Sequence, residues 1–415
     1  MSKLQPARGT RDIYGDDARH MTMVVDTFKR VAASYGFEEM VTPIFEFTEV
    51  YKRPLGEASD IVSKEMYSFE DRGGEEITLR PEFTAGVCRA FISNGLQQNL
   101  PCRFMSHGPA FRYERPQKGR YRQFHQINAE LLGSDAPESD VDMLSLAWRI
   151  LSELGISDDV VLHFNTLGDV QSRTQYRDAL VAYFSKHKDT LSEDSKRRLT
   201  TNPLRILDSK DASDKEIVAN APLISGSLTD EARSFFDTVR RGLDVIGIPY
   251  HHDERLVRGL DYYTHTAFEF VTSALGAQGT VLAGGRYDGL IEQLGGPVTP
   301  GIGWAGGIER LAMLSQAGAA PARSVVMMPM GDAATLKAFA LAEGLRRNNF
   351  TVTQDRSGNL KKRLNRANKA SARFAVVIGD NELENGVVAL KDLDTGTQQE
   401  ISFDRLASAI QESNK

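Results

Sequence analysis

The segment from Phe111 to Glu130 limits the possible folds of this chain more than any other, because it reads as two strand-like arms joined by a turn at 116–119. Side chains alternate sides along a strand, so each arm gathers polar residues on one face. Those residues are Arg112 and Glu114 on the first arm and Arg122, Phe124, Gln126, Asn128 and Glu130 on the second. An apolar core would not accept this set, whereas a nucleotide and a zwitterionic amino acid would suit it. A solvated hairpin is the alternative for a generic charged segment, and the motifs below decide against it.

A second polar segment runs from Arg255 to Phe270 and opens with an arginine, a glycine, an acid and two adjacent tyrosines. A strand usually places Thr, Ser, Lys or Glu at its polar positions. Here Arg258, Tyr262 and Tyr263 lie close together in the sequence beside the backbone-permissive Gly259. We interpret the segment as a buried polar wall that binds a small ligand, with the fixed positive charge of Arg258 beside it.

Composition sets the broad class. The length of 415 residues predicts two or three domains. No apolar run is long enough to cross a bilayer, and the first residues lack the apolar core of a signal peptide. Cys88 and Cys102 are too few for a disulfide framework or a structural zinc site, so a reducing cytoplasm is the expected compartment. The net charge of -6 argues against a general nucleic-acid coat but allows a local basic surface.

The order of predicted elements divides the chain into two domains, residues 1–320 and 325–415. Residues 6–12 read as an ordered turn before a helix over about 17–35, and a strand ends at residues 41–43. Charged helical patterns fill about 167–249, and we interpret them as a helical insertion because strand patterns resume at residue 255. A small-residue linker at 316–324 leads to the second domain.

The second domain has the pattern of a compact α/β fold. Its predicted strands are 325–330, 351–355, 373–378, 387–392 and 398–403, and its predicted helices are 333–348, 359–370 and the C-terminal end. The second of these helices opens a basic span without an acid, formed by Lys361, Lys362, Arg363, Arg366, Lys369 and Arg373. A charged helical face of this kind is usually only solvated.

Two patterns in the sequence are decoys. Gly301, Gly303 and Gly306 spell G-x-G-x-x-G, but a dinucleotide-binding fold needs an acid about 20 residues further on, and 311–326 contains none. The adjacent residues His-His-Asp-Glu at 251–254 cannot all converge on one ion without strain. We expect a polar loop there, and no metal site is predicted.

Together the motifs resemble those of the histidyl-tRNA synthetases, a family of class II aminoacyl-tRNA synthetases. The hairpin is similar to motif 2, the stretch around Pro43 lies where motif 1 belongs, and residues 301–311 resemble motif 3. Residues 79–86 resemble the amino-acid-binding loop of that family, and residues 283–289 another of its signatures. The resemblance covers essentially the whole chain. It implies an α/β (α+β) core with a class II antiparallel sheet flanked by helices, a helical insertion, and a C-terminal α/β anticodon-binding domain.

The resemblance also implies the reaction. L-Histidine would be ligated to tRNA(His) through a histidyl-adenylate, with release of AMP and pyrophosphate, by a cytoplasmic homodimer. ATP with Mg²⁺ is the implied cosubstrate, and the metal would ride on the phosphates without a dedicated protein cage. The P-loop pattern is absent, so side chains would have to hold the ATP.

The family motifs imply roles for individual residues. The implied catalytic residues are Arg258, Arg112 and Gln126. The implied histidine-binding residues are Glu82, Phe83, Thr84, Arg112, Gln126, Glu130, Arg258, Tyr262 and Tyr263. The implied ATP-binding residues are Arg112, Glu114, Arg120, Phe124, Arg258 and Arg310. The implied tRNA-binding residues are Arg115 and Gln117 at the acceptor end, and Lys361, Lys362, Arg363 and Arg366 in the anticodon-binding domain.

Some details stay open at this point. Within the pocket, Glu130 and Tyr263 would pair with the two imidazole nitrogens. Many relatives have a glycine at the position of Phe83, so the approach of the backbone to the substrate there is undecided. One alternative is a histidine-binding regulatory subunit of ATP phosphoribosyltransferase, which generally lacks the complete Arg258 segment and the C-terminal domain. Another is a prolyl- or threonyl-type synthetase, which would not be expected to keep Glu130 with the Tyr262–Tyr263 pair.

Overall fold

The computed structural model of the chain describes residues 3–56, 59, 61–115, 119–257, 262–276, 279–315 and 323–413. The chain divides into two compact units, Met1–Ala319 and Ala320–Lys415, and each is described by itself. Within the described ranges, no helix is both long enough and apolar enough to cross a membrane.

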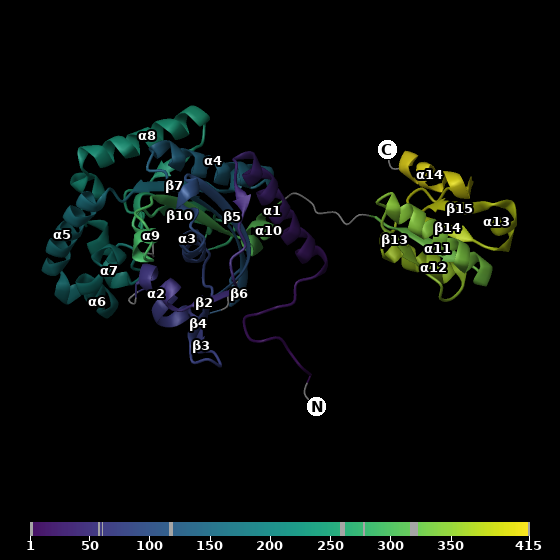
Figure 1. Cartoon of the computed structure of the whole chain (residues 1–415), viewed down its shortest axis with the longest axis horizontal. Helices are drawn as coiled ribbons and strands as arrows, with labels where there is room; N and C mark the ends of the chain where they lie inside the picture. Colours follow the sequence, from purple (N-terminus) through teal and green to yellow (C-terminus); the bar gives the residue numbers. More distant parts are fainter. Residues whose placement is uncertain are drawn as a thin grey trace. The chain divides into compact units, whose positions relative to one another are not determined.

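An eight-stranded sheet forms the centre of the first unit, in the order β1-β5-β6-β11-β10-β9-β7-β8 (Figure 1). Its strands are β1 (Glu38–Glu39), β5 (Cys102–Phe111), β6 (Gln123–Leu132), β7 (Val161–Thr166), β8 (Tyr250–His252), β9 (Thr264–Val271), β10 (Thr280–Arg286) and β11 (Gly301–Gly307). Only the two edge pairs, β1 with β5 and β7 with β8, are parallel. The predicted antiparallel sheet is therefore confirmed. The strand expected to end at 41–43 ends earlier, at Glu39. Its last hydrogen bond to β5 is donated by the N–H of Met40, and Pro43 has no N–H to donate.

Strand β6 separates the core of this unit from the site. Its odd-numbered residues Ile127, Ala129 and Leu131 are buried in the main hydrophobic core. That core lies between the sheet and the helices α1 (Gly15–Ser34), α4 (Pro137–Glu153), α8 (Asp230–Ile246) and α10 (Ile308–Leu314). The even-numbered residues of β6 point to the other face of the sheet, because side chains alternate along a strand.

The opposite face of the sheet is partly covered by α2 (Glu49–Leu55), α3 (Thr84–Ser93) and α9 (Leu290–Gln293), which share a second apolar cluster. Beside α3 lies a small three-stranded sheet in the order β2-β4-β3, formed by β2 (Phe45–Phe47), β3 (Tyr67–Glu70) and β4 (Glu76–Leu79). These elements border the part of the face that is left open.

Helices fill the region predicted as an insertion. The helices α5 (Val170–Lys186), α6 (Glu193–Thr201) and α7 (Ala212–Ala219) gather at one side of the unit (Figure 1) and have an apolar cluster of their own. Asp169, Ser192 and Asp211 start these three helices by accepting hydrogen bonds from N–H groups of the first turn. The last helix of the region, α8, instead packs against α4 in the main core.

The second unit is a five-stranded sheet in the order β13-β12-β14-β15-β16. Its elements are β12 (Val325–Pro329), α11 (Asp332–Arg347), β13 (Val352–Gln354), α12 (Leu360–Lys369), β14 (Phe374–Ile378), α13 (Asp380–Asn385), β15 (Val387–Asp392), β16 (Gln398–Ser402) and α14 (Leu406–Glu412). The strands and helices predicted with bounds are present, with ends that differ by at most one residue, whereas the short helix α13 and the 3-10 helix Phe403–Arg405 were not predicted.

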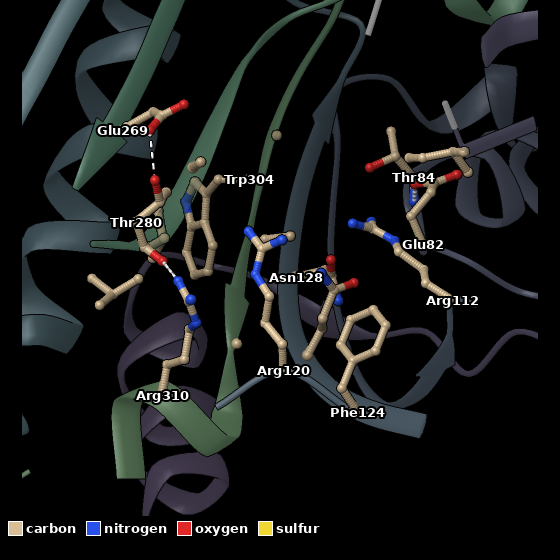
Figure 2. Close-up of a pocket in the computed structure, with 18 of the residues that line it drawn as sticks. Glu82, Thr84, Arg112, Arg120, Phe124, Asn128, Glu269, Thr280, Trp304 and Arg310 are labelled. Carbon is tan, nitrogen blue, oxygen red and sulfur yellow. Dashed lines mark hydrogen bonds between the residues drawn. The ribbon is translucent and has the colours of Figure 1, made fainter. Parts of the chain in front are cut away.

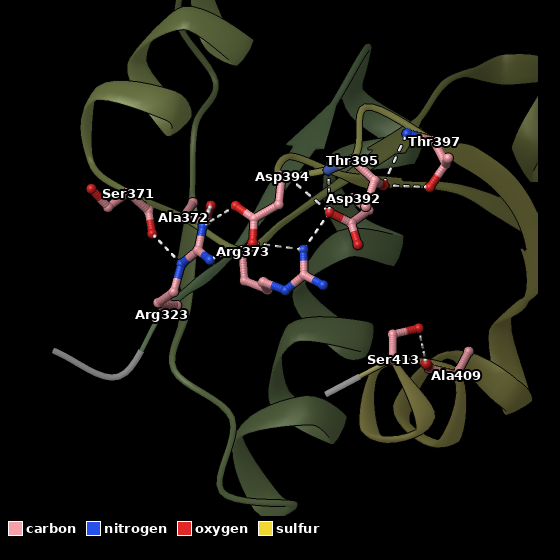
Figure 3. A network of polar contacts seen from close by, with 10 residues as sticks. All are labelled: Arg323, Ser371, Ala372, Arg373, Asp392, Asp394, Thr395, Thr397, Ala409 and Ser413. Atoms are coloured by element: carbon pink, nitrogen blue, oxygen red, sulfur yellow. Dashed lines mark hydrogen bonds and ion pairs between the residues drawn. The ribbon is translucent and has the colours of Figure 1, made fainter. Parts of the chain in front are cut away.

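An ion-pair network fixes the start of the second unit (Figure 3). The guanidinium of Arg323 binds both carboxylate oxygens of Asp394 at 2.6 Å and donates to the carbonyls of Ser371 and Ala372 at 3.1 Å. Arg373 pairs with Asp392 and lies 3.1 Å from Asp394. Arg373 is thus already neutralised by carboxylates, although the sequence places it in the basic span.

Candidate active site

A cavity of about 640 Å³ opens on the face of the large sheet opposite the main core. Phe124, Gln126 and Asn128 enter it from alternate positions of β6, as the hairpin pattern predicted. Figure 2 shows that Glu82, Thr84 and Arg112 lie on one side of Phe124 and Asn128, with Arg310, Thr280 and Glu269 on the other. The cavity therefore has two ends joined by β6.

A buried carboxylate marks the first end. Glu82 accepts hydrogen bonds from the backbone N–H groups of Thr84 at 2.5 Å and Ala85 at 2.9 Å, at the start of α3. Burial raises the pKa of the Glu82 carboxyl, although these bonds and the nearby Arg112 act in the opposite direction. A carboxylate held in this way by a helix N-terminus is a suitable acceptor for an ammonium group.

Glu130 lies behind this end and not in the cavity wall. Its carboxylate accepts a hydrogen bond from Thr84 Oγ1 at 2.6 Å and another from the hydroxyl of Tyr287. Burial raises the pKa of Glu130 to about 8. Direct pairing of Glu130 with a ligand, expected from the sequence, stays a prediction, because Thr84 and not Glu130 lines the cavity in this arrangement.

Gly303 explains how β11 approaches Glu130. A Cβ atom on Gly303 would lie 1.6 Å from Oε2 of Glu130 and 2.8 Å from the carbonyl of Ala129. The glycine is therefore required for close packing of β11 on β6. Its strand pairs antiparallel with both β6 and β10, which confirms that G-x-G-x-x-G here is not a dinucleotide fingerprint.

Two tyrosines close the same end. The rings of Tyr262 and Tyr263 are buried, line the cavity and have centroids 4.7 Å apart. The pKa of Tyr262 is raised well above its usual value. Burial is the largest cause, and the electrostatic interaction with Tyr263 is the next. The Tyr262 hydroxyl therefore keeps its proton at neutral pH.

Arginines line the cavity from the first end to the second. Arg112, on the same side as Glu82, donates from Nε to the carbonyl of Pro81 at 2.9 Å, and its guanidinium lies 5.3 Å from the centre of the Phe124 ring. Arg120 binds Glu114 at 2.9 Å. The Arg310 side chain is buried and donates to the carbonyl of Thr280. Burial, with the charge of Arg120 next in size, lowers the pKa of Arg310. Fixed cations beside an aromatic face suit the phosphates and base of a nucleotide.

Two amides between the ends lack a partner. Within the described part of the chain, Oε1 of Gln126 and both amide atoms of Asn128 are buried and make no hydrogen bond. Both side chains line the cavity. Buried polar atoms in native proteins are almost always paired with protein, water or a ligand, so these amide atoms are available to a polar group that enters the cavity.

Sequence reasoning missed several residues of the cavity wall. Glu269 on β9 and Thr280 on β10 both line it, and the Thr280 hydroxyl donates to Glu269 at 2.7 Å. The signal for Glu269 was present, since it is the one acid among the apolar residues of β9. Arg205 and Asp208 of the helical region also line the cavity, and nothing in the sequence connects them with it.

The structure corrects two predicted contacts. Phe83 is buried with its ring 4.0 Å from the guanidinium of Arg80 and does not line the cavity. Its φ of -104° suits any residue, so no glycine is needed there. Arg363 is also buried, because its guanidinium donates to the carbonyls of residues 329, 355, 356 and 358. It is a structural residue and cannot reach a phosphate.

The other predicted tRNA contacts differ in their surroundings. Arg115, Lys361 and Lys362 are exposed, and Arg366 is exposed but holds Asp355 by two bonds of 2.7 Å. Gln117 and Arg258 lie outside the described residues.

A large antiparallel sheet with an acidic pocket and an arginine-lined pocket on one face, joined to an α/β domain, defines a class II aminoacyl-tRNA synthetase. The family model described as "Histidyl-tRNA synthetase" matches residues 9–311, and the model "Anticodon binding domain" matches residues 324–413. The chain belongs to the histidyl-tRNA synthetase family, and the family predicted from its motifs is confirmed.

The relatives agree over the whole length. A histidine–tRNA ligase of Gluconobacter oxydans is 55% identical over 99% of both chains, and one of Rhodospirillum rubrum is 54% identical over 97% of both. The crystal structure of apo S. aureus histidyl-tRNA synthetase matches with a TM-score of 0.83 and 34% identity, covering 98% of this chain and 99% of that one. A structure described as an "ATP phosphoribosyltransferase regulatory subunit/histidyl-tRNA synthetase" from Bacillus halodurans shares the fold, with a TM-score of 0.67 at 19% identity.

Proposed function

We propose that this protein ligates L-histidine to tRNA(His) with the use of ATP, with histidine at the Glu82 end of the cavity and the nucleotide at the Arg310 end. The observation that carries the proposal is the pair of unpartnered amides, Gln126 and Asn128, between an acidic and a cationic pocket. The predicted enzyme class agrees with the relatives named above, which are histidine–tRNA ligases.

The first step would form the histidyl-adenylate. The histidine carboxylate attacks the α-phosphorus of ATP, a carboxyl–phosphate bond forms, and the bond to pyrophosphate breaks. Fixed guanidinium groups, foremost that of Arg112, would then stabilise the negative charge on the phosphate oxygens. Correct positioning of the two substrates would supply most of the rate enhancement. Arg258 is proposed beside the same phosphate from the family motif.

Histidine would be held by polar groups of the first end. Glu82, Thr84 and Gln126 are proposed for the α-ammonium group, because the Glu82 carboxylate is already oriented by α3. Tyr263 is proposed for the imidazole. Glu130 would take part through Thr84, or directly after Thr84 shifts. An amino acid without these polar groups would leave buried partners unpaired, which rejects it strongly.

ATP would lie along the cationic end. Phe124 is proposed to stack on adenine with Glu114 beside its amino group, and Arg120 and Arg310 are proposed for the outer phosphates. Magnesium suits this end as well, because hard cations prefer oxygen ligands and usually take one or two carboxylates plus phosphates. Glu269, with Thr280 beside it, would hold the metal, which would neutralise phosphate charge when bound. Among the described residues, no group of three or more His, Cys, Asp or Glu side chains could hold a metal ion by itself.

The second step would transfer the histidyl group to the 3′ end of tRNA(His) with release of AMP. Arg115 and Gln117 are proposed for the acceptor end. Lys361, Lys362 and Arg366 are proposed for phosphates near the anticodon, because all three are exposed on α12.

A cytoplasmic homodimer is the proposed assembly. Large apolar side chains are exposed on and beside the three-stranded sheet, at Val41, Ile44, Phe45, Phe47 and Phe69. A cluster of this kind is typical of a protein interface, and it lies in the motif 1 region. Sedimentation would test it: Phe45→Asp should dissociate the dimer, whereas Val298→Asp, at an exposed valine elsewhere on this unit, should not. An unchanged Phe45→Asp dimer would exclude this interface.

Charging of a tRNA(His) transcript with labelled histidine tests the ligase function directly. The regulatory-subunit alternative predicts histidine binding in a calorimeter without charging. Histidyl-tRNA formation that needs ATP supports the ligase, and its absence from a protein that binds histidine supports the regulator.

A further inference from the structure

We propose that the N-terminal turn, residues 7–11, is a positioning element for the motif 2 hairpin and holds the arm that carries Arg120, Tyr121 and Phe124. The inference rests on the proposed function, because these side chains face the proposed ATP site. No reacting group lies in the turn itself, so its effect would be exerted through the hairpin arm.

Backbone hydrogen bonds attach the turn to the outgoing arm. The N–H of Arg122 donates to the carbonyl of Gly9 at 2.8 Å, and the N–H of Arg112 donates to the carbonyl of Arg122 at 2.9 Å. Arg122 is therefore bonded to the N-terminal turn on one side and to the incoming arm on the other. The turn completes the hydrogen bonding of a backbone segment that would otherwise have an unpaired N–H.

Gly9 lets the turn approach the Arg122 side chain. Its φ is +86°, and a Cβ atom there would lie 2.7 Å from Cγ and 2.8 Å from Cδ of Arg122. Arg122 in turn covers the ring of Tyr113 at 3.7 Å and donates from Nε to the carbonyl of Glu114 at 3.4 Å. The turn therefore packs closely against Arg122, whose side chain contacts the incoming arm of the hairpin and itself belongs to the outgoing arm.

Arg11 joins the same arm to helix α1. Its guanidinium lies 4.7 Å from the centre of the Tyr121 ring, and Nη1 binds the Asp17 carboxylate at 2.9 Å. The turn is closed by Thr10, whose N–H and hydroxyl donate to the carbonyl of Ala7 at 3.0 and 2.8 Å. The arm is thus tied to the first turn of α1 through Arg11.

The position of the arm matters for the cavity. Arg120 and Tyr121 line it directly, and Phe124 follows two residues after Arg122. A small displacement of the arm would move the cation and the stacking ring proposed for ATP. On the histidine side, Glu82 and Thr84 belong to a different element, and Gln126 lies further along β6, where the strand is paired with β11. The turn should therefore affect ATP more than histidine.

Two pairs of variants test this in the full-length protein. Gly9→Ala introduces the clash with Arg122, and Gly15→Ala is its matched control, because Gly15 has a φ of +61° but no atom within 4 Å of its Cβ position. Arg11→Gln removes the cation over Tyr121. Its control, Arg19→Gln, removes an arginine that pairs with Asp16 on α1 and is similarly exposed.

We expect Gly9→Ala and Arg11→Gln to raise KM for ATP in pyrophosphate exchange by about tenfold, because misplaced binding groups weaken nucleotide binding. KM for histidine and the thermal unfolding midpoint should follow the control variants. Amide hydrogen exchange at Arg122 should be faster in Gly9→Ala, which a merely structural loss elsewhere would not produce.

The outcomes separate this inference from the proposed function. Wild-type protein without histidine-dependent exchange would overturn the proposed function. Active wild type with Gly9→Ala and Arg11→Gln indistinguishable from their controls would overturn the inference alone, as would equal increases in KM for ATP and histidine.

Discussion

The carboxylate of Glu309 holds His125 at two points. It accepts a hydrogen bond from the backbone N–H of His125 at 3.0 Å and lies 2.8 Å from the ring Nδ1. His125 follows Phe124 on β6, and Glu309 precedes Arg310 on α10. This pair therefore sets the relative positions of the ring and the guanidinium proposed to bind ATP.

Removal of this link should weaken ATP binding selectively. We expect Glu309→Ala to raise KM for ATP by about tenfold with little change for histidine, since the two ATP-binding groups lose their common support. Glu309→Gln keeps an acceptor oxygen and should recover most of the loss. Steady-state pyrophosphate exchange measures both constants, and a parallel rise in both would show that Glu309 supports the fold in general.

The buried pair Arg286–Asp140 should contribute strongly to stability. Both side chains are fully buried, and Arg286 Nε lies 3.0 Å from Asp140 Oδ1. Asp140→Ala should lower the free energy of unfolding by about 3 kcal/mol, the lower end of the range for breaking a buried pair, because Arg286 keeps its ion pair with Asp288 at 3.0 Å. On the same helix, Asp142 pairs with Arg103 at the surface, so Asp142→Ala should cost less than about 1 kcal/mol. Urea denaturation measures both, and similar losses would contradict this account.

Glu130 should make stability depend on pH. Its pKa of about 8 in the folded protein is above that of an unfolded glutamate, so the stability that it contributes is present at low pH and lost as the pH rises through the folded pKa. The free energy of unfolding should fall relative to that of Glu130→Gln by roughly 3 kcal/mol between pH 5 and pH 8. Denaturant curves at both pH values test this, and parallel behaviour of the two proteins would mean that Glu130 is already ionised.

The basic helix α12 should separate into structural and tRNA-binding residues. Arg363→Ala should destabilise the C-terminal unit by about 2 kcal/mol, because the buried carbonyl of Pro329 and three partly buried carbonyls lose their donor. Lys361→Ala and Lys362→Ala should leave stability unchanged and reduce the slope of tRNA affinity against log salt by about one each. Filter binding at several salt concentrations checks the second point. Equal effects of Arg363 and the lysines on the slope would contradict the assignment.

Local sequence patterns were sufficient to predict the structure where the alternation of side chains along a strand, or the turn residues between elements, decides it. The alternation in β6 placed Gln126 and Asn128 on one face, and both line the cavity. The intervening Ile127 and Ala129 lie in the core. The C-terminal domain was also predicted nearly residue by residue, because its short strands and helices are bounded by turn residues.

The errors concern partners that are distant in the sequence. The alternation of side chains along the strand placed Glu130 on the correct face. The sequence did not show that Tyr287, 157 residues away, donates a hydrogen bond to one of its carboxylate oxygens. The run Lys-Lys-Arg gives no sign that only the arginine turns inward to the carbonyls of a neighbouring strand and loop. Arg205 reaches the cavity only because the helical region folds back toward it. Such contacts depend on tertiary packing, which a local pattern does not contain.

Histidine-dependent ATP–pyrophosphate exchange by wild type, Gln126→Ala and Gln123→Ala tests the central claim most directly. Gln126 lines the cavity, whereas Gln123 is an exposed glutamine at the start of the same strand. The account predicts exchange with histidine alone among the amino acids, a loss of about 100-fold in kcat/KM for Gln126→Ala, and a change within about twofold for Gln123→Ala. Absence of exchange in the wild type, or equal activity of the two variants, would contradict it.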